Sequence, residues 1–413
     1  MSERKVPKIR FPGFTGEWVE KKLGEVLSVE TIRNGSTFSK EDVLSVSDEY
    51  GCVNQIRFQG RSFAGEDISN YKIVQTGDIV YTRSPLKAKP FGIIKIVREE
   101  TGIVSPLYIV NQVKVSNDPE FLYRVFDSSA KTNNYLSPLV RKGAKNTMNI
   151  SEEEWLSGKI NVSDSFEEQK SIGDFFKRLD ESITQIQTEL TKWKELKKSM
   201  LQKMFPKEGE SVPEIRFPGF TDPWEQRKVG ELSKRVIVGL ATSVTPYYRQ
   251  EGIPILRNLN IKENYLDDTD ILFLERAYAE SQVSKQIHTG DVLTVHTGYI
   301  GTSCIVPAKY DNCLTFTTLI TTTDDSILHG EFLAQYLNSE IGISAVQAVT
   351  TQGGRQNLNT NDFIKVEIRY PSLAEQEAIC SMLRNIDTLI TLHQRECDKW
   401  QTLKKALLQQ MFV

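Results

Sequence analysis

The heptapeptide IRFPGFT occurs twice in this chain, at residues 9–15 and again at residues 215–221. A Pro-Gly step suits the central positions of a type II turn, where glycine supplies the positive φ angle that the turn requires. A turn alone does not explain the flanking residues, because a tryptophan and a Gly-Glu pair follow each copy at the same distance. These residues are Trp18 with Gly24 and Glu25, and Trp224 with Gly230 and Glu231. The repeated unit is therefore longer than one turn.

A second pair of matching segments closes the repeat. Residues 165–205 and residues 372–412 align without a gap, and each contains Glu-Gln near its start, Lys-Trp in its second half and Met-Phe at its end. Long-range internal similarity of this kind indicates a duplicated structural unit. The chain is therefore predicted to be two copies of one unit, and the Pro-, Gly- and charge-rich segment 206–213 is the predicted linker.

The two closing segments have the pattern of long helices. Their apolar residues recur in alternating steps of four and three, which is a heptad repeat, and each helix would be about 60 Å long. Two apolar stripes in one chain are most simply buried against each other, and a chain that runs out and back favours the antiparallel pairing. Packing of each helix on its own domain is the alternative. The predicted seam consists of Ile172, Leu179, Ile183, Ile186, Leu190 and Trp193 in the first helix and Ile379, Ile386, Ile390 and Trp400 in the second.

Between these shared ends the two copies diverge. Short β-branched and aromatic runs, such as DIVYT at 78–82 and VLTVHTG at 292–298, are broken by Gly, Asn and Pro, which predicts small, mixed, strand-rich domains. The predicted fold class is α+β, with two such domains joined by two long antiparallel coiled-coil helices in an internal pseudo-twofold repeat. The expected boundaries are 1–163 for the first domain, 164–205 for the central helix, 206–370 for the second domain and 371–413 for the C-terminal helix.

Composition and motifs exclude several classes of function. The sequence contains no apolar run long enough for a membrane span and no apolar core of a signal peptide. Five scattered cysteines without a CxxC motif predict neither disulfides nor a zinc site, and they fit a reducing cytoplasm. His393 and Cys397 have the i, i+4 spacing of metal ligands, but they occupy seam positions and no third ligand is near, so we predict no metal site.

No motif of a catalytic site stands out. The sequence lacks a Walker loop, a GxGxxG after a strand, and the Asn/Asp-Pro-Pro-aromatic motif of an adenine methyltransferase, and its four histidines do not cluster. We therefore expect no catalytic residue and no cofactor in this chain itself.

The divergent domains do contain residue types that bind nucleic acid. The net charge of −3 means that such a partner must be bound by local patches. Lys and Arg can contact phosphates, while Arg, Asn and Gln can recognise base edges. One such residue is more often part of a solvated loop, but here they cluster in acid-free or Gly-rich stretches. The candidates are Arg33, Arg83, Lys87, Lys89, Asn133, Asn134, Arg141, Lys142 and Lys145 in the first copy and Tyr248, Arg249, Arg257, Asn258, Asn260, His296, Thr297, Tyr299, Gln352, Arg355, Gln356 and Asn357 in the second.

With these motifs the chain resembles the specificity subunit of type I restriction–modification systems. The resemblance rests on GIPILRNLN at 252–260, the GDV…GxxG loop at 290–301, QGGRQNLN at 352–359, and the Leu-x-Glu-Gln opening of the second long helix at 373–376. The first copy is less regular, since TRSPLKAKPFG at 82–92 replaces the compact Gly loop.

The resemblance implies a non-catalytic subunit whose two target recognition domains each recognise one half of a bipartite, asymmetric site in double-stranded DNA. It also implies that the helix pair spaces the domains and docks two modification subunits, which carry S-adenosylmethionine and methylate adenine at N6. Two restriction subunits would add cleavage that depends on ATP and Mg. Two other interpretations stay open: a coiled-coil scaffold with protein partners only, and a fragment of a fused nuclease–methyltransferase.

Overall fold

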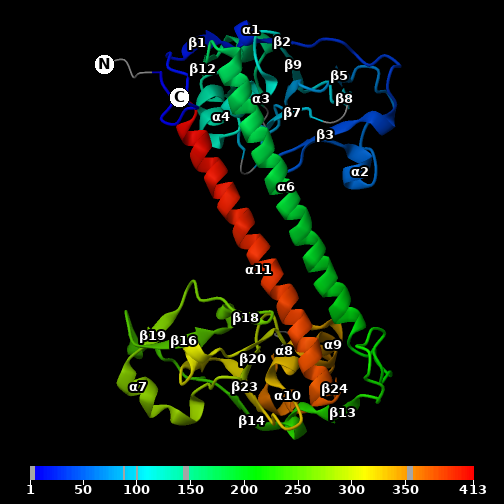
Figure 1. The fold of residues 1–413 in the computed structure, drawn as a ribbon, viewed down its shortest axis with the longest axis vertical. Helices are drawn as coiled ribbons and strands as arrows, with labels where there is room; N and C mark the ends of the chain where they lie inside the picture. The colour runs from blue at the N-terminus through cyan, green and yellow to red at the C-terminus, as the bar shows by residue number, and fades with distance from the viewer. Residues whose placement is uncertain (1–4, 87–88, 99–100, 143–147, 351–356) are drawn as a thin grey trace. The chain divides into compact units, whose positions relative to one another are not determined.

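The computed structural model describes residues 5–86, 89–98, 101–142, 148–350 and 357–413 (Figure 1). The chain forms two compact units. Unit 1 consists of Met1–Thr188 with Gln394–Val413, and unit 2 consists of Glu189–His393. Both changes of unit occur inside a long helix, α6 (Phe166–Lys203) or α11 (Leu373–Gln410). Each unit therefore contains one part of each long helix.

Unit 1 is built on a four-stranded antiparallel sheet of order β2-β9-β6-β7, with separate pairs β5-β8, β3-β4, β1-β12 and β10-β11. Short helices connect and cover these strands. The strands are β1 (Val19–Lys22), β2 (Leu27–Val29), β3 (Leu44–Ser47), β4 (Gly51–Asn54), β5 (Lys72–Val74), β6 (Ile79–Tyr81), β7 (Ile94–Ile96), β8 (Gly102–Val104), β9 (Ile109–Val113), β10 (Arg141–Lys142), β11 (Met148–Asn149) and β12 (Lys159–Val162). The short helices are α1 (Leu23–Val26), α2 (Gln55–Gln59), α3 (Pro119–Val125), α4 (Ser129–Leu136) and α5 (Glu152–Ser157).

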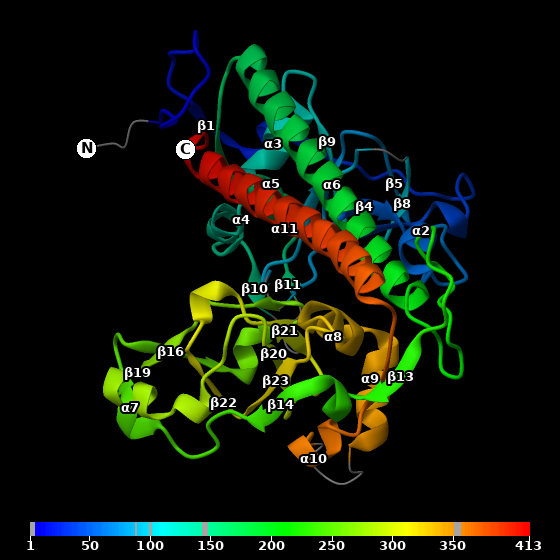
Figure 2. The same cartoon turned by 60° about the horizontal axis from the view of Figure 1, so that its bottom comes forward.

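Unit 2 contains an antiparallel sheet of order β14-β23-β20-β21 and a second sheet of order β15-β19-β16-β22. Helix α8 packs beside β20 and β21 of the first sheet (Figure 2). The strands are β13 (Glu225–Lys228), β14 (Ser233–Val238), β15 (Tyr248–Arg249), β16 (Ile253–Arg257), β17 (Ile261–Lys262), β18 (Tyr265–Leu266), β19 (Leu272–Leu274), β20 (Val292–Val295), β21 (Ser303–Ile305), β22 (Leu314–Phe316), β23 (Thr318–Thr323) and β24 (Glu367–Tyr370). The short helices are α7 (Arg276–Ser281), α8 (Gly330–Asn338), α9 (Glu340–Val349) and α10 (Thr360–Phe363).

The two units share one framework. In the main sheet of each unit, the strand that pairs with the first strand, β9 with β2 or β23 with β14, comes last in the chain. A Thr-Gly-Asp turn precedes the next strand of that sheet, β6 or β20. The carboxylate of Asp78 accepts a 2.8 Å hydrogen bond from the backbone N–H of Gln75, and that of Asp291 accepts one of the same length from His288. The α+β fold class and the internal repeat predicted from the sequence are therefore confirmed.

Within each unit the two long helices run antiparallel. In unit 1, Lys404 of α11 pairs with Asp180 of α6 at 2.8 Å, and Phe412 packs on Phe176 of the preceding turn of α6. In unit 2 a second set of pairs has the same opposed order, with Lys197 to Asp387 at 2.6 Å and Glu189 to His393 at 3.3 Å. Of the predicted seam residues, Ile172, Leu179, Ile183, Leu190, Ile379 and Ile386 are buried, and Ile186, Trp193, Ile390 and Trp400 are half-buried.

The repeated heptapeptide attaches the start of each long helix to its unit. Arg10 donates a 2.8 Å hydrogen bond from Nη2 to Oε2 of Glu168, and Arg216 makes the same 2.8 Å bond to Glu375. A second bond from Nε makes each pair bidentate, which is the strong geometry for arginine and carboxylate. The turn that presents each arginine needs glycine, since Gly13 and its counterpart adopt φ angles of 96° and 95°.

The glutamine that follows each of these glutamates ties the long helix to a second helix. Gln169 accepts a 2.9 Å hydrogen bond from the N–H of Asp118, the residue before α3. Gln376 accepts a 2.9 Å bond from the N–H of His329, the residue before α8. The duplicated Glu-Gln pair is therefore a structural anchor.

Among the described helices, none combines the length and the apolar character that a membrane span needs.

Candidate nucleic-acid interface

In unit 2 the structure brings four of the predicted DNA-binding residues together. Asn258, after β16, donates a 3.0 Å hydrogen bond from Nδ2 to the hydroxyl of Thr297, in the loop after β20. Thr297 also forms an isolated β-bridge with Asn357, and the backbone carbonyl of His296 accepts a 2.9 Å bond from Leu358. Three segments that are far apart in the sequence thus meet in one polar cluster, which we define as Asn258, His296, Thr297 and Asn357.

The polar cluster contains one ring nitrogen without a hydrogen-bond partner and lies on the same loop as an exposed aromatic ring. His296 is half-buried, and burial lowers the pKa of its imidazole while a hydrogen bond with Asn357 opposes that shift. Its Nε2 atom is buried and has no hydrogen-bond partner among the described residues. At the tip of the same loop, Tyr299 is 89% exposed between Gly298 and Gly301, whose φ angles of 87° and 90° allow the tight loop. This loop therefore presents an aromatic ring beside amide, hydroxyl and imidazole groups.

Other candidates in unit 2 are engaged within the fold. Arg257 donates to the carboxylate of Asp270 at 2.8 Å, and Arg249 pairs with Glu275. Tyr248 is half-buried and packs against an apolar cluster. Asn260 is 0% exposed, and its Nδ2 donates to the backbone carbonyls of Asp267 and Asp270. The amide of Asn260 therefore shapes the turn after β16, and the structure leaves no part of this residue exposed for a contact with DNA.

Arg83, a predicted DNA-binding residue of unit 1, is bonded to backbone carbonyls in the structure. It has a φ angle of 52°, which is uncommon for a residue other than glycine. Its guanidinium donates to the backbone carbonyls of Leu107, at 2.7 Å from Nε, and Ile150, at 3.3 Å from Nη1. These bonds tie three loops of unit 1 together, so Arg83 positions the loops and has little capacity left for a phosphate.

The remaining candidates in unit 1 occupy mixed environments. Arg33 is exposed and donates to the carbonyl of Asn70 at 3.0 Å, while Lys89 donates to Ser129 at 2.8 Å. In α4, Asn133 is half-buried and Asn134 is exposed. The side chain of Arg141 in β10 is 83% exposed, with Glu154 at 3.2 Å. Lys87, Lys145, Gln352, Arg355, Gln356 and the side chain of Lys142 lie outside the described residues.

The sequence interpretation missed one member of the unit 2 site. Thr318, at the start of β23, donates a 3.0 Å hydrogen bond to Oδ1 of Asn258 and so fixes which way that amide points. Threonine in a strand-like run carries no signal for such a role. Only the pairing of β23 beside β20 reveals it.

Comparisons with known proteins agree on one family. The family described as "Type I restriction modification DNA specificity domain" matches residues 15–194 and again residues 221–399. The provisionally named type I restriction enzyme MjaX specificity subunit of Methanocaldococcus jannaschii is 23% identical over 433 residues, covering 95% of this chain and 92% of that protein.

Solved structures show the same fold. The type I restriction–modification S subunit from M. genitalium superimposes with a TM-score of 0.62 at 12% identity, covering 99% of each chain. A chain from a study of complex assembly and conformational transition of the type I R-M system superimposes with a TM-score of 0.52 at 17% identity, covering 98% of each chain.

Proposed function

Because this chain belongs to the family of type I restriction–modification DNA specificity domains, we propose that it selects the DNA sequence on which a type I restriction–modification complex acts. The observation that carries this proposal is the duplication of the family's domain on one framework with two different loop surfaces. We propose that each unit recognises one half of a bipartite, asymmetric site in double-stranded DNA. A duplicated framework with divergent loops suits a target whose two halves differ in sequence.

The polar cluster of unit 2 supports direct recognition of bases. Asparagine amides and a histidine ring can donate and accept hydrogen bonds at base edges, and an exposed tyrosine can pack against a thymine methyl group or a sugar. Two hydrogen bonds hold Asn258 in one orientation before DNA arrives, since its Nδ2 donates to Thr297 and its Oδ1 accepts from Thr318. A preorganised amide loses less conformational entropy on binding than a free one.

The long helices suit a role in spacing and docking. We propose that they set the gap between the two half-sites and that the duplicated framework offers equivalent surfaces to two copies of a modification subunit. In this proposal the modification subunits bind S-adenosylmethionine and methylate adenine at N6, while two restriction subunits add cleavage that depends on ATP and Mg. This family is non-catalytic, so the chemistry belongs to the partners. The family match gives no support to a pure scaffold or to a fused nuclease–methyltransferase fragment.

Methyl transfer provides the direct test of this division of labour. The purified chain, mixed with DNA and labelled S-adenosylmethionine, should transfer no methyl groups. Addition of the modification subunit should produce transfer that saturates at two copies per chain, measured by label incorporation against protein ratio. Transfer by the chain alone, above a sample without protein, would contradict the proposal.

Two arginines of unit 1 should respond differently to truncation. Arg141→Ala should weaken binding of the assembled complex to all DNA sequences alike and reduce the slope of log K against log salt by about one, because one exposed cation is lost. Arg83→Ala should leave that slope unchanged, since its guanidinium bonds to backbone carbonyls. Fluorescence anisotropy titrations at several salt concentrations measure both. A changed slope for Arg83→Ala with none for Arg141→Ala would reverse these two assignments.

A further inference from the structure

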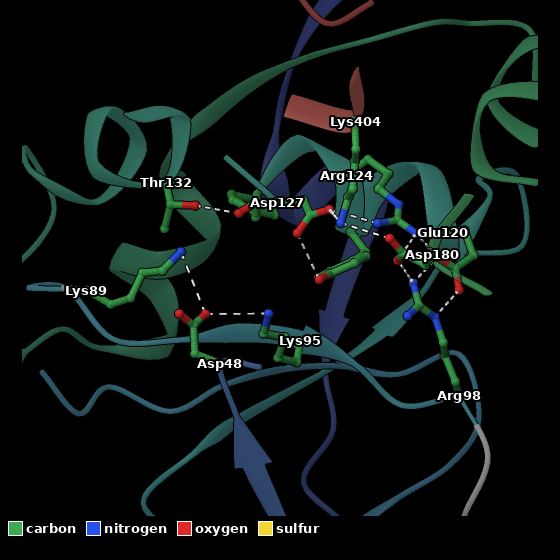
Figure 3. A network of polar contacts seen from close by, with 12 residues as sticks. Asp48, Lys89, Lys95, Arg98, Glu120, Arg124, Asp127, Thr132, Asp180 and Lys404 are labelled. Atoms are coloured by element: carbon green, nitrogen blue, oxygen red, sulfur yellow. Dashed lines mark hydrogen bonds and ion pairs between the residues drawn. The ribbon is translucent and has the colours of Figure 1, made fainter. Parts of the chain in front are cut away.

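Unit 1 contains a network of charged side chains whose members are not among the predicted DNA-binding residues, and Figure 3 shows it together with neighbouring polar residues. Three cations and three anions form it: Arg98, Arg124 and Lys404 with Glu120, Asp127 and Asp180. We call these six residues the unit 1 charge network. They come from α3 and the residues beside it, from the segment after β7, from α6 and from α11.

Asp180 and Asp127 are the two centres of the network. Asp180 of α6 accepts from Arg124 at 2.8 Å, from Arg98 at 3.1 Å and from Lys404 at 2.8 Å. Asp127 accepts from Arg124 at 2.7 Å and from Lys404 at 2.9 Å. Arg98 completes the set with a 2.7 Å bond to Glu120. Both long helices are thus joined to α3 of the recognition domain at one point.

The centre of the network is buried. The side chain of Arg124 is 0% exposed and that of Asp127 is 10% exposed. Burial alone would raise the pKa of Asp127, but Lys404 and Arg124 outweigh it and hold the pKa at about 2. Burial would likewise raise the pKa of Asp180, and Arg124 and Lys404 again lower it. These two aspartates therefore stay ionised at neutral pH.

Such a network is a poor way to gain stability. Desolvation of buried charges costs several kcal/mol per ion, and apolar residues of the same volume often serve stability as well or better. Here even the paired arrangement leaves a donor unsatisfied, since the Nε atom of Arg124 is buried and without a partner among the described residues. The network does restrict the relative orientation of the elements that it joins, because charge-assisted bonds to a guanidinium are restricted in angle while apolar contacts are not.

Unit 2 has neutral residues in place of the buried pair of Arg124 and Asp127. Aligned on the shared Glu-Phe-Leu of α3 and α8, Arg124 corresponds to Gln335 and Asp127 to Asn338. Gln335 accepts a 2.9 Å bond from Asn264, and Asn338 donates to the carbonyl of Ser303 at 2.8 Å. These two side chains therefore bind α8 to β21 and its neighbours within the recognition domain. Toward the long helices, the described part of unit 2 keeps the counterpart of the Lys404–Asp180 pair, which is Lys197 with Asp387, and Glu331 of α8 pairs with Arg384 of α11.

We propose that the unit 1 charge network is a positioning device that fixes the orientation of the first recognition domain on the two long helices. It thereby makes methylation intolerant of a changed gap between the half-sites. The inference rests on the proposed function, and its residues act through the helices without touching DNA. Rotation of the domain on the helices would separate buried charges, so the network penalises it steeply.

The residues of unit 2 at the aligned positions suggest a suitable variant of unit 1. R124Q/D127N gives unit 1 the two residues that unit 2 has at these places, removes one charge of each sign and keeps the pair of Lys404 with Asp180. The matched control is K170Q/D174N, which removes an exposed i, i+4 pair, 3.3 Å apart, from α6, the helix that carries Asp180. Each variant is assembled with its modification subunits and assayed for methyl transfer on duplexes whose gap is shortened or lengthened by one base pair.

The wild-type complex and K170Q/D174N should both discriminate strongly against the altered gaps. In R124Q/D127N the ratio of methylation on the native gap to methylation on the altered gaps should fall about tenfold, which corresponds to about 1.4 kcal/mol. Its preference for each base of the two half-sites should not change, whereas a defect of the recognition loops would alter base preference. If R124Q/D127N does not fold, R98Q/E120Q removes a more exposed pair of the same network and should show the same loss in smaller degree.

Unchanged gap discrimination in folded network variants, beside a wild type that discriminates, would overturn this inference alone. Altered base preference in the first half-site without a change in gap tolerance would also overturn it, since the network would then support the recognition loops. A wild-type complex that ignores the gap would overturn the proposed spacing function, and the inference with it.

Discussion

Replacing Glu168 by alanine should destabilise unit 1 by about 3–5 kcal/mol, the usual effect of removing one partner from a buried ion pair. Glu168 is 0% exposed and accepts hydrogen bonds from four donors. Two come from the guanidinium of Arg10, one from the hydroxyl of Ser163 at 2.5 Å and one from the indole of Trp18 at 3.3 Å. Its loss leaves a guanidinium without its carboxylate and frees the start of α6 from the turn of the first heptapeptide.

Hydrogen exchange measured by mass spectrometry can assign this loss to one unit. Peptides from β6 and β9 of unit 1 should lose protection, while those from β20 and β23 of unit 2 should not. Glu167→Ala is the matched control, because Glu167 is one residue away and exposed, and its side chain is bonded only to the hydroxyl of Ser165 among the described contacts. Glu375→Ala should give the mirror result in unit 2. Equal protection in Glu168→Ala and Glu167→Ala would show that the heptapeptide does not anchor the helix.

Much of the fold could be predicted because it depends on patterns that are local or duplicated. The heptad spacing alone indicates the long helices, and the Met-Phe ends of the repeats align without any structural knowledge. In the structure these ends are buried, with Phe412 against Trp18 and Phe121 in unit 1, and Phe205 against Trp224 and Phe332 in unit 2. Repetition marked the Glu-Gln pairs as important, but their partners lie elsewhere in the chain, so their anchoring role could not be inferred.

The candidate site was harder to predict for a physical reason. The donors and acceptors that contact a base are the same groups that satisfy a backbone carbonyl, and only the fold decides between them. Arg83 and Asn260 have the right chemistry for DNA, but Leu107, Ile150, Asp267 and Asp270 supply carbonyls at hydrogen-bond distance. Asn258 and Thr297, by contrast, come together only because β16 and β20 end near each other.

The asymmetry between the units was visible but uninterpretable in the sequence. Alignment of the repeats shows Arg124 opposite Gln335, which by itself resembles ordinary divergence. The difference can be interpreted only in the structure, where Asp180 binds the guanidinium of Arg124 and Lys404 binds Asp127, the other partner of that guanidinium. Tertiary contacts of this kind leave no periodic signal.

Exchange of one recognition domain tests the central claim most directly. Residues 24–160 would be replaced by the matching segment of a relative, keeping Arg98, Glu120, Arg124 and Asp127 so that the unit 1 charge network is preserved. The chimera would be expressed with its modification subunits, and methylated adenines would be mapped across the host genome by single-molecule sequencing. A parallel exchange of residues 230–366 serves as the control for unit 2.

We expect a large effect confined to one half of the site, because the contacts of separate units should add independently. The first chimera should methylate a bipartite motif with one new half, the original other half and the original gap, and the control chimera should show the converse. A motif in which both halves change, or in which neither half follows the exchanged domain, would contradict the account of two independent recognition domains on a common frame.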